Sequence, residues 1–499
     1  MATMIDRTGT TPANAYAAPD AARRAALAIL IVAAIVGAGL RFYRLGADEM
    51  SRGEAAAWTA AAAPDLRSVF FASKQLDPGK SGVYDLVLHL WIGAFGDAVG
   101  PMRSLSALLG TLAILLIFAA VREIFRAFDD GRHPELASSA AAFAALLYAC
   151  NLQMVTIDRT ARMYPLMLVA VFGQLWAFAR AHRQPEVGTI IGAALCTDLA
   201  VAANFTSLFL FMAEAFWLVY LWLSLGRKIN ADTGGPGLSV WRPAAALILA
   251  GALFLPIGIT DAHIAVNVLH AGILGSIEPR PLWWPFRALQ VMTGNAAFWP
   301  MLMLAIFAVW RTRRQGRAIG FMLCWMLAPF ALLELVSYAI TPMMVERYVL
   351  IGLAGYLALT AVGLASISKV PLRYLIAAIV VSQSLAHVHH HWRTPEDVQW
   401  REAARFAIQA APAGGQIAVM PPDEPLLVLK YYLPPSAHPR LVSADATLDP
   451  SRHWQMRCGP ELLLIASTEL PAESRPRLEA CYPRLLKRFR LVEVRALNR

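Results

Sequence analysis

Acidic and basic side chains gather in a few short stretches that follow apolar runs. The first stretch, "LGADEMSRGEAAAW" (45–58), carries Asp48, Glu49, Arg52 and Glu54. A carboxylate can accept the proton of an attacking hydroxyl group, and a nearby cation can neutralise a phosphate. These residue types therefore suit group transfer from a phosphate-bearing donor.

Similar residues stand beside other apolar runs, in "QLDPGKSGVYD" (75–85), "DRTARMY" (158–164) and "MMVERY" (343–348). Arginines at a membrane surface can instead snorkel, and tyrosines there can belong to the aromatic belt. With these alternatives open, the candidate catalytic residues are Glu54, Asp48, Glu49 and Asp158, and the candidate residues for binding a lipid phosphate or sugar are Lys80, Tyr84, Arg159, Arg162, Tyr164, Glu346, Arg347 and Tyr348.

The composition indicates that membrane helices position these residues. The chain has 499 residues, of which 58% are hydrophobic, and a mean hydropathy of +0.50. This is too apolar for a soluble protein of that length. The formal net charge of +10 lies mostly in short loops between apolar runs, which is a topology signal. We therefore expect a multi-pass membrane protein without a nucleic-acid partner.

Apolar runs of about 17 to 25 residues are long enough to cross a membrane. Basic loops such as "RTRRQGR" (311–317) fall on alternate connections, which we expect to be cytoplasmic. The run at 84–96 is too short for a span and carries Asp85 and His89, so it predicts an interfacial or re-entrant helix. The expected spans are about eleven: 24–42, 103–121, 135–155, 164–181, 187–204, 206–225, 243–262, 295–310, 318–339, 348–366 and 371–388.

The composition becomes polar after about residue 389. Helical periodicity at 397–411 and 424–433 alternates with strand-like runs at 416–421, 440–445, 461–468 and 489–497. This alternation predicts a small α/β domain. Cys458 and Cys481 lie in this domain. They could form a disulfide with each other or remain free thiols, and the sequence leaves both alternatives open. The expected domains are a disordered cytoplasmic tail (1–22), a transmembrane domain (23–388) with a first periplasmic loop (43–102), and a periplasmic α/β domain (389–499).

Several motifs, in their order and spacing, resemble the GT-C fold glycosyltransferases of families 39 and 83. That group includes protein O-mannosyltransferases and lipid A aminoarabinose transferases. The C-terminal part resembles the extracytoplasmic appendage of the same group. The motifs are "LRFYRLG" (40–46), "GKSGVYDLVLHLWIGAFGD" (79–97), "MRSLSALLGTLAILLIF" (102–118), "ARMYPLMLV" (161–169) and "ERYVLIGLAGYLAL" (346–359).

The resemblance implies an inverting glycosyltransferase in the bacterial inner membrane that uses a polyprenyl-phosphate sugar on the outer face. The expected partners are this donor, membrane lipid and an acceptor that is a lipid, glycan or protein. No cofactor is expected, although a divalent cation is compatible with the site. The N-terminus is expected in the cytoplasm and the C-terminal domain in the periplasm. The resemblance implies these roles: Glu54 as the acidic loop residue, Asp48 or Glu49 as a substitute base, Lys80, Arg162 and Arg347 as phosphate contacts, and Tyr164 and Tyr348 as positioning residues.

Two departures from the family pattern leave a second hypothesis open. The family's Asp-Glu pair falls on Gly53 and Glu54, so the usual first-loop aspartate is absent. Thr160 stands where the family's "EARMY" segment has its acid, with Asp158 two residues upstream. The alternative is therefore a catalytically degenerate GT-C-like protein that binds or scaffolds components of polysaccharide or lipid assembly.

Overall fold

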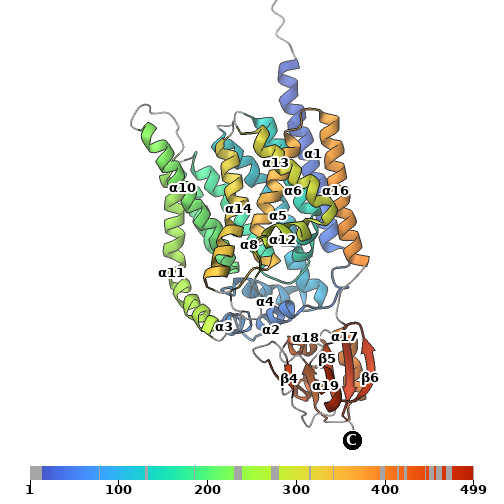
Figure 1. Cartoon of the computed structure of the whole chain (residues 1–499). Coiled ribbons are helices and arrows are strands. Elements are labelled where there is room, and N and C mark those ends of the chain that lie inside the picture. Colours follow the sequence, from blue (N-terminus) through green and yellow to red (C-terminus); the bar gives the residue numbers. More distant parts are fainter. Residues whose placement is uncertain are drawn as a thin grey trace, which may run out of the picture. The chain divides into compact units, whose positions relative to one another are not determined.

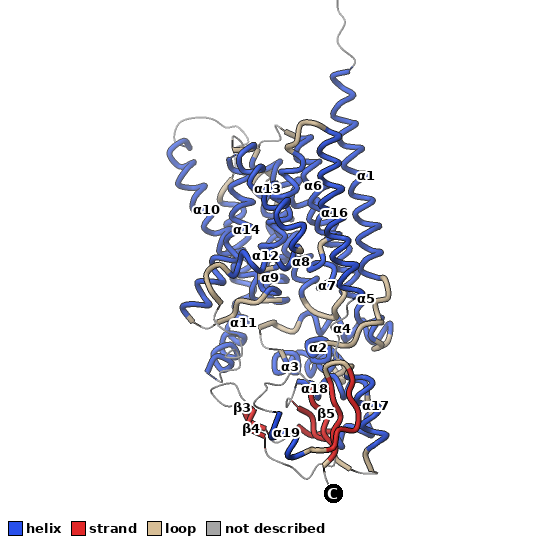
Figure 2. Tube along the Cα trace, turned by 45° about the vertical axis from the view of Figure 1, so that its right-hand side comes forward, coloured by secondary structure: helices blue, strands red, loops and turns tan. Residues whose placement is uncertain are grey.

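In this computed structural model the chain is mostly helical, with a small sheet in its C-terminal part (Figure 1). Figure 2 separates the helices from these strands by colour. The structure describes residues 14–77, 79–129, 133–184, 186–229, 239–270, 280–313, 316–340, 342–393, 399–412, 415–420, 424–443, 446–448, 454–456, 463–467 and 475–497.

The chain divides into two compact units. The helical unit comprises Met1–Phe42, Ala107–Asp158 and Tyr164–His389. The mixed unit comprises Tyr43–Ser106, Arg159–Met163 and His390–Arg499. The first long loop, five residues from the middle of the chain and the C-terminal part therefore belong to one unit. The domain boundaries expected from composition stay predictions.

The helical unit consists of long apolar helices that run side by side (Figure 1). It holds all or most of α1 (Asn14–Phe42), α5 (Val99–Phe128), α6 (Pro134–Cys150), α7 (Leu152–Asp158), α8 (Tyr164–Ala181), α9 (Val187–Ala203), η1 (Phe205–Ser207), α10 (Leu208–Ile229), α11 (Trp241–His270), α12 (Trp284–Thr293), α13 (Asn295–Arg311), α14 (Gly316–Ala339), η3 (Glu346–Tyr348), α15 (Leu350–Ala365) and α16 (Val370–Arg393).

Within the described residues, 7 helices are long and apolar enough to cross a membrane, and up to 9 spans result if each of two bent pairs is one span. The bent pairs are α6 with α7, at 65°, and α12 with α13, at 113°. The shorter apolar helices α9 and α15 coincide with two further expected spans. Each expected span therefore falls on an apolar helix or bent pair, and the prediction of a polytopic helical membrane protein is confirmed.

The two bends have local causes in the sequence. Between α6 and α7, the side-chain oxygen of Asn151 accepts a hydrogen bond from the backbone N–H of Met154 at 3.1 Å, as a helix N-cap does. Between α12 and α13, Gly294 has a φ of 82°, which residues with a Cβ rarely adopt. Each bend thus starts a new helix with its own direction.

Helix α15 lies at the centre of the helical unit, because all of its residues are buried. Its glycines allow close contact with neighbouring backbones. A Cβ at Gly355 would lie 2.8 Å from the Met326 backbone of α14. A Cβ at Gly363 would overlap the Leu304 backbone of α13. Side chains at these positions would push the helices apart.

The mixed unit combines the helices of the first loop with a C-terminal sheet. Strands β1, β2 and β5 pair in parallel, whereas β7 pairs antiparallel with both β5 and β6, in the order β2-β1-β5-β7-β6. Strands β3 and β4 form a separate antiparallel pair. The elements are α2 (Arg52–Ala61), α3 (Leu66–Leu76), α4 (Val83–Phe95), α17 (Trp400–Ala410), β1 (Ile417–Met420), α18 (Glu424–Tyr432), η4 (Pro435–Arg440), β2 (Leu441–Ser443), β3 (Ala446–Leu448), β4 (Trp454–Met456), β5 (Leu463–Ser467), α19 (Arg475–Cys481), β6 (Arg484–Phe489) and β7 (Val492–Ala496).

The α/β character of the C-terminal part is confirmed, with one correction. The expected single strand at 489–497 is the end of a hairpin, because Leu491 has a φ of 55° and turns the chain between β6 and β7. Strand β6 has no apolar run or alternation that would predict a strand, because it is mostly exposed and carries several charges. Charged side chains on an edge strand hinder pairing with a further strand. Cys481 is disulfide-bonded. Its expected partner, Cys458, lies outside the described residues, so that pairing stays a prediction.

Candidate functional site

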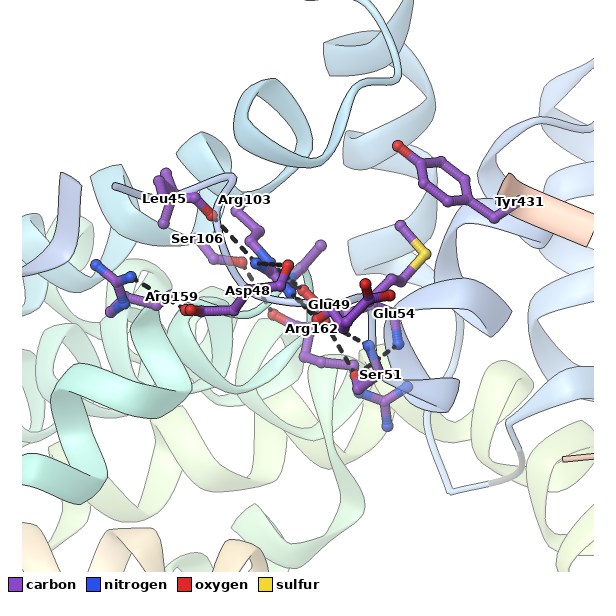
Figure 3. A network of polar contacts seen from close by, with 12 residues as sticks. Leu45, Asp48, Glu49, Ser51, Glu54, Arg103, Ser106, Arg159, Arg162 and Tyr431 are labelled. Atoms are coloured by element: carbon purple, nitrogen blue, oxygen red, sulfur yellow. Dashed lines mark hydrogen bonds and ion pairs between the residues drawn. The ribbon is translucent and has the colours of Figure 1, made fainter. Parts of the chain in front are cut away.

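Glu54 is the centre of a polar network in the mixed unit (Figure 3). Its carboxylate accepts hydrogen bonds from Nε and Nη2 of Arg103 at 2.7 and 2.9 Å. It also accepts the backbone N–H of Ser51 at 3.0 Å and that of Ala161 at 2.9 Å. Ser51 and Glu54 form a capping box at the start of α2. The side chain is 1% exposed, so the carboxylate is both buried and fully engaged.

Arg103 extends this network into the preceding loop. Its guanidinium donates to the backbone carbonyls of Leu45 and Asp48, each at 3.1 Å, and to that of Glu49 at 2.7 Å. Burial raises the pKa of Glu54, but the Arg103 charge and the hydrogen bonds outweigh it, so the pKa lies below its ordinary value. The pair is therefore ionised and fixes the loop conformation.

Asp48 is the most accessible of the expected acids, with a side chain that is 48% exposed. Its carboxylate lies 3.3 Å from Nη2 of Arg159. Arg159 also donates to the Tyr43 carbonyl at 2.6 Å and lies over the Trp392 ring. In this ion pair the Asp48 carboxylate is open to solvent, whereas the Arg159 side chain is only 8% exposed.

Glu49 lies between the first loop and the C-terminal helices of the same unit. Its carboxylate is 3.7 Å from Nε of Arg401, and its side chain is 14% exposed. The Tyr432 hydroxyl, which accepts the backbone N–H of Met50 at 2.7 Å, belongs to the same cluster. Burial raises the pKa of Glu49 above its ordinary value, against the opposing effects of Tyr432 and Arg401.

A second cluster of charges joins Arg162 to the turn between α3 and α4. Nη1 of Arg162 lies 2.7 Å from Oδ2 of Asp77 and donates to the Gly53 carbonyl at 2.8 Å. Lys80 lies 3.3 Å from the same Asp77 oxygen and 2.7 Å from Asp85. Burial raises the pKa of Asp77, but the charges of Arg162 and Lys80 lower it by more than burial raises it. The pKa of Asp77 is therefore below its ordinary value. Asp77 keeps a side chain that is 22% exposed.

Gly53 explains how Arg162 reaches this cluster. A Cβ at residue 53 would lie 3.0 Å from Cζ of Arg162. The guanidinium therefore occupies the space next to the position where the resembling family carries its aspartate. Asp77 is the carboxylate that contacts the guanidinium there.

Tyr84 and Lys80 are less accessible than the sequence suggested. The Tyr84 hydroxyl shares a hydrogen bond of 2.9 Å with the buried Ser106 hydroxyl, and the tyrosine is 1% exposed. The Lys80 side chain is 2% exposed and held by two carboxylates. A phosphate could reach Lys80 only by displacing Asp77 or Asp85.

Asp158 lies in the helical unit, in a buried ion pair. Arg41 approaches its Oδ2 with Nε at 2.8 Å and Nη2 at 2.7 Å, and both side chains are 0% exposed. Nη1 of Arg41 donates to the Gly37 and Ala149 carbonyls, each at 3.1 Å. This pair ties α1 to α6 and α7, which is a structural function.

The remaining expected residues also belong to the helical unit. Tyr164 is buried at the start of α8. Glu346 and Tyr348 are half-buried in η3, and Arg347 is exposed, with its guanidinium 5.4 Å from the Tyr348 ring. The structure therefore brings Asp48, Glu49, Glu54, Lys80, Tyr84, Arg159 and Arg162 together in the mixed unit and holds Asp158, Tyr164, Glu346, Arg347 and Tyr348 in the helical unit.

The geometry argues against two of the expected catalytic acids. A general base needs a free lone pair within reach of the acceptor hydroxyl. Glu54 has its oxygens saturated by Arg103, Ser51 and Ala161. Asp158 is 0% exposed beside Arg41, so an acceptor hydroxyl cannot reach it. Both carboxylates therefore make contacts that stabilise the fold, and both are less accessible than Asp48 and Asp77.

Sequence reasoning missed the partners that decide these roles. Arg41 and Arg103 look like ordinary residues at the ends of apolar runs, and no local spacing links either to its acid. Asp77 and Asp85, the partners of Lys80, both stand in the quoted stretch "QLDPGKSGVYD", so these two did have a sequence signal. In the part of the chain that the structure describes, no three His, Cys, Asp or Glu side chains group as metal ligands.

Substituting Gly110 with alanine is expected to destabilise the helical unit by about 1–3 kcal/mol, as overpacking of a core does. A Cβ at this position of α5 would overlap the Asp158 carboxyl group, so the ion pair with Arg41 must shift. The melting temperature of the purified protein in detergent measures the effect. Gly251→Ala in α11 is the matched control, because its Cβ would meet nothing within 4 Å. An unchanged melting temperature for Gly110→Ala would show that the pair is loosely held.

Comparison with known proteins places the fold. No model of a known protein family and no curated protein sequence matches the chain. Among solved structures, ArnT from Cupriavidus metallidurans bound to undecaprenyl phosphate is similar with a TM-score of 0.60 and 13% identity, over 94% of this chain and 97% of that one. Its apo state gives the same TM-score at 12% identity.

A second protein, the Archaeoglobus fulgidus oligosaccharyltransferase tethered with an acceptor peptide, is similar with a TM-score of 0.51 and 12% identity. The similarity covers 84% of this chain and 63% of that one. Both proteins are GT-C fold glycosyltransferases. At these identities the likeness concerns the fold, and it confirms the resemblance noted in the sequence. This chain is a multi-pass membrane protein with the GT-C fold.

Proposed function

We propose that this protein transfers a sugar from a polyprenyl-phosphate donor to an acceptor on the outer face of the bacterial cytoplasmic membrane. The observation that carries the proposal is the likeness, over nearly the whole chain, to ArnT bound to undecaprenyl phosphate. The arginines and acids gathered in the mixed unit support it, because such groups suit a phosphate donor and a hydroxyl acceptor. The alternating basic loops support a cytoplasmic N-terminus and a periplasmic C-terminal domain.

In the proposed reaction an acceptor hydroxyl oxygen attacks the anomeric carbon, and the bond from that carbon to the phosphate oxygen breaks. Polyprenyl phosphate leaves with the electron pair, and the hydroxyl proton passes to a carboxylate. A single displacement of this kind inverts the anomeric centre. Arg162 and Arg159 would neutralise the phosphate, so the proposal includes no metal cofactor.

We assign the role of proton acceptor to Asp77. Arg162 and Lys80 both contact Oδ2 of Asp77, which leaves its other oxygen for the acceptor hydroxyl. A donor phosphate that binds these cations would compete with Asp77 for them. Losing the cations would raise the pKa of Asp77 and make it a stronger base when the donor is bound.

The test is turnover by the purified full-length protein in lipid nanodiscs. A panel of synthetic polyprenyl-phosphate sugars is supplied with a membrane extract as acceptor, and released polyprenyl phosphate is measured by mass spectrometry. Release that depends on both donor and extract is expected. Glu135→Gln is the control variant, because Glu135 is an exposed acid at the start of α6, outside the site.

A binding or scaffolding protein without catalysis is the second candidate. The glycine at position 53 and the saturated carboxylate of Glu54 favour it. A purified sample that retains polyprenyl phosphate but releases none from any donor would support this candidate over the enzyme.

Asp48→Asn and Glu49→Gln are each expected to reduce sugar transfer by less than about tenfold. Each removes an acid whose cation, Arg159 or Arg401, lies outside the Asp77 cluster. Steady-state kinetics should show the effect of Asp48→Asn in KM, because releasing Arg159 changes donor binding. A loss of about a hundredfold in kcat for either variant would assign the proton acceptor to that residue instead.

A further inference from the structure

A cavity of about 340 Å³ opens among the ends of three membrane helices in the helical unit. The last turns of α5, the start of α6 and the residues at the end of α8 form its wall. Helix α8 has 18 residues and begins at Tyr164, so the cavity lies about 27 Å along α8 from that residue. The cavity is therefore separate from Tyr164, which begins α8, and from Asp158, which ends α7.

The wall of this cavity is basic. Arg122, Arg126, Arg180 and Arg183 outnumber the two carboxylates, which are Glu123 and Asp129. Arg180 lies 3.4 Å from Glu186, which is outside the cavity wall. The cations still exceed the acids at these ends of membrane helices, where lipid head groups lie, so the site attracts an anion.

One buried carboxylate orients two of the arginines. The Glu123 side chain is 4% exposed and lies 3.5 Å from Nη1 of Arg126 and 3.4 Å from Nη1 of Arg183. The two arginine side chains remain 43% and 42% exposed. Each guanidinium thus uses one nitrogen to contact Glu123 and keeps accessible N–H groups for a ligand.

The cavity also has an apolar wall, formed by Phe125, Pro134 and Ala137. A site for a small soluble anion would not need one, whereas a lipid brings acyl chains and a glycerol group with its phosphate. Arginines that only fix membrane orientation would need neither a cavity nor a buried acid to hold them. The combination is typical of a pocket for an anionic lipid head group.

We propose that this cavity binds the phosphate head group of an anionic glycerophospholipid from the surrounding bilayer. Arg126 and Arg183 contact the phosphate, and the apolar wall contacts the beginning of the acyl chains. Inorganic phosphate shares the same anionic chemistry, and the apolar wall favours the lipid. The proposal does not depend on sugar transfer, since none of the residues that line the cavity belongs to the proposed sugar-transfer site.

Native mass spectrometry of the full-length protein, titrated with phosphatidylglycerol in detergent, tests the proposal. Saturable binding is expected for the wild type, with phosphatidylcholine and inorganic phosphate binding much more weakly. The double variant Arg126→Gln/Arg183→Gln should bind phosphatidylglycerol at least about tenfold more weakly. Because the double variant leaves the buried Glu123 without its cations, a triple variant that adds Glu123→Gln should also bind weakly. The melting temperature of this triple variant in a neutral detergent should match the wild type, which separates lost binding from lost folding.

The matched control is Arg311→Gln/Arg313→Gln, which removes the same charge from exposed arginines at and beyond the end of α13. It should bind phosphatidylglycerol as the wild type does. Equal loss of binding in both double variants would show a general charge effect and overturn the site. Full competition by inorganic phosphate at matched concentration would overturn the assignment to a lipid.

Discussion

Asparagine in place of Asp77 is expected to slow sugar transfer by about 10²–10⁴-fold, the usual contribution of a general base. The substitution keeps the size of the side chain but removes the proton acceptor between Arg162 and Lys80. The rate of polyprenyl phosphate release at saturating donor measures the effect. Glu402→Gln is the control, because Glu402 is an exposed acid on α17 of the same unit.

A carboxylate returned to position 53 should restore part of this loss. The double variant Gly53→Asp/Asp77→Asn places an acid beside Arg162, whose flexible guanidinium can move from the 3.0 Å that separates it from a Cβ there. Rescue of at least tenfold over Asp77→Asn alone would show that the two positions are functionally equivalent. Wild-type rates in Asp77→Asn would remove Asp77 from the mechanism, whereas an inactive wild type would count against the proposed function itself.

Glutamine in place of Glu54 is expected to destabilise the mixed unit by about 3–5 kcal/mol, because Arg103 would keep a buried charge without its partner. The melting temperature of the purified protein gives the measurement. Glu54→Gln/Arg103→Met, which removes both charges, should recover much of the loss. Equal melting temperatures for Glu54→Gln and the wild type would mean that the pair contributes little.

The same pair predicts a pH dependence with a definite sign. Because the pKa of Glu54 in the folded protein lies below its ordinary value of 4.5, its stabilising effect is complete above that value. It is lost as the pH falls through the lower pKa of the folded state. The melting temperature of the wild type should therefore fall in this acidic range more steeply than that of Glu54→Gln.

The membrane helices could be predicted from sequence because run length and apolarity are local properties. Even so, α9 and α15 are shorter than the expected spans, and α15 is buried on all sides, which its apolar sequence does not distinguish from a lipid-facing span. Strand β6 could not be predicted, because its pairing with β7 depends on a turn at Leu491 that residue type does not reveal. Tertiary context decided both cases.

The sequence could predict which residue types and which regions form the candidate site, but not which side chain pairs with which. Glu54 lies 49 residues from Arg103, and Arg41 lies 117 residues from Asp158. Such pairings follow from the fold and leave no periodic pattern. Lys80 shows the same limit at short range, since its neighbours Asp77 and Asp85 hold the side chain that the sequence predicted as a phosphate contact.

The network around Glu54 fixes the loop at residues 45–51 during folding, so this loop has lost its conformational entropy before any ligand binds. Arg103 and Glu54 connect the carbonyls of residues 45, 48 and 49, the start of α2 and the backbone of Ala161. These segments become ordered when the chain folds, so a ligand that binds beside them loses little affinity to loop ordering. The buried pair therefore acts on binding without contacting a ligand, by keeping the surrounding polar groups preorganised.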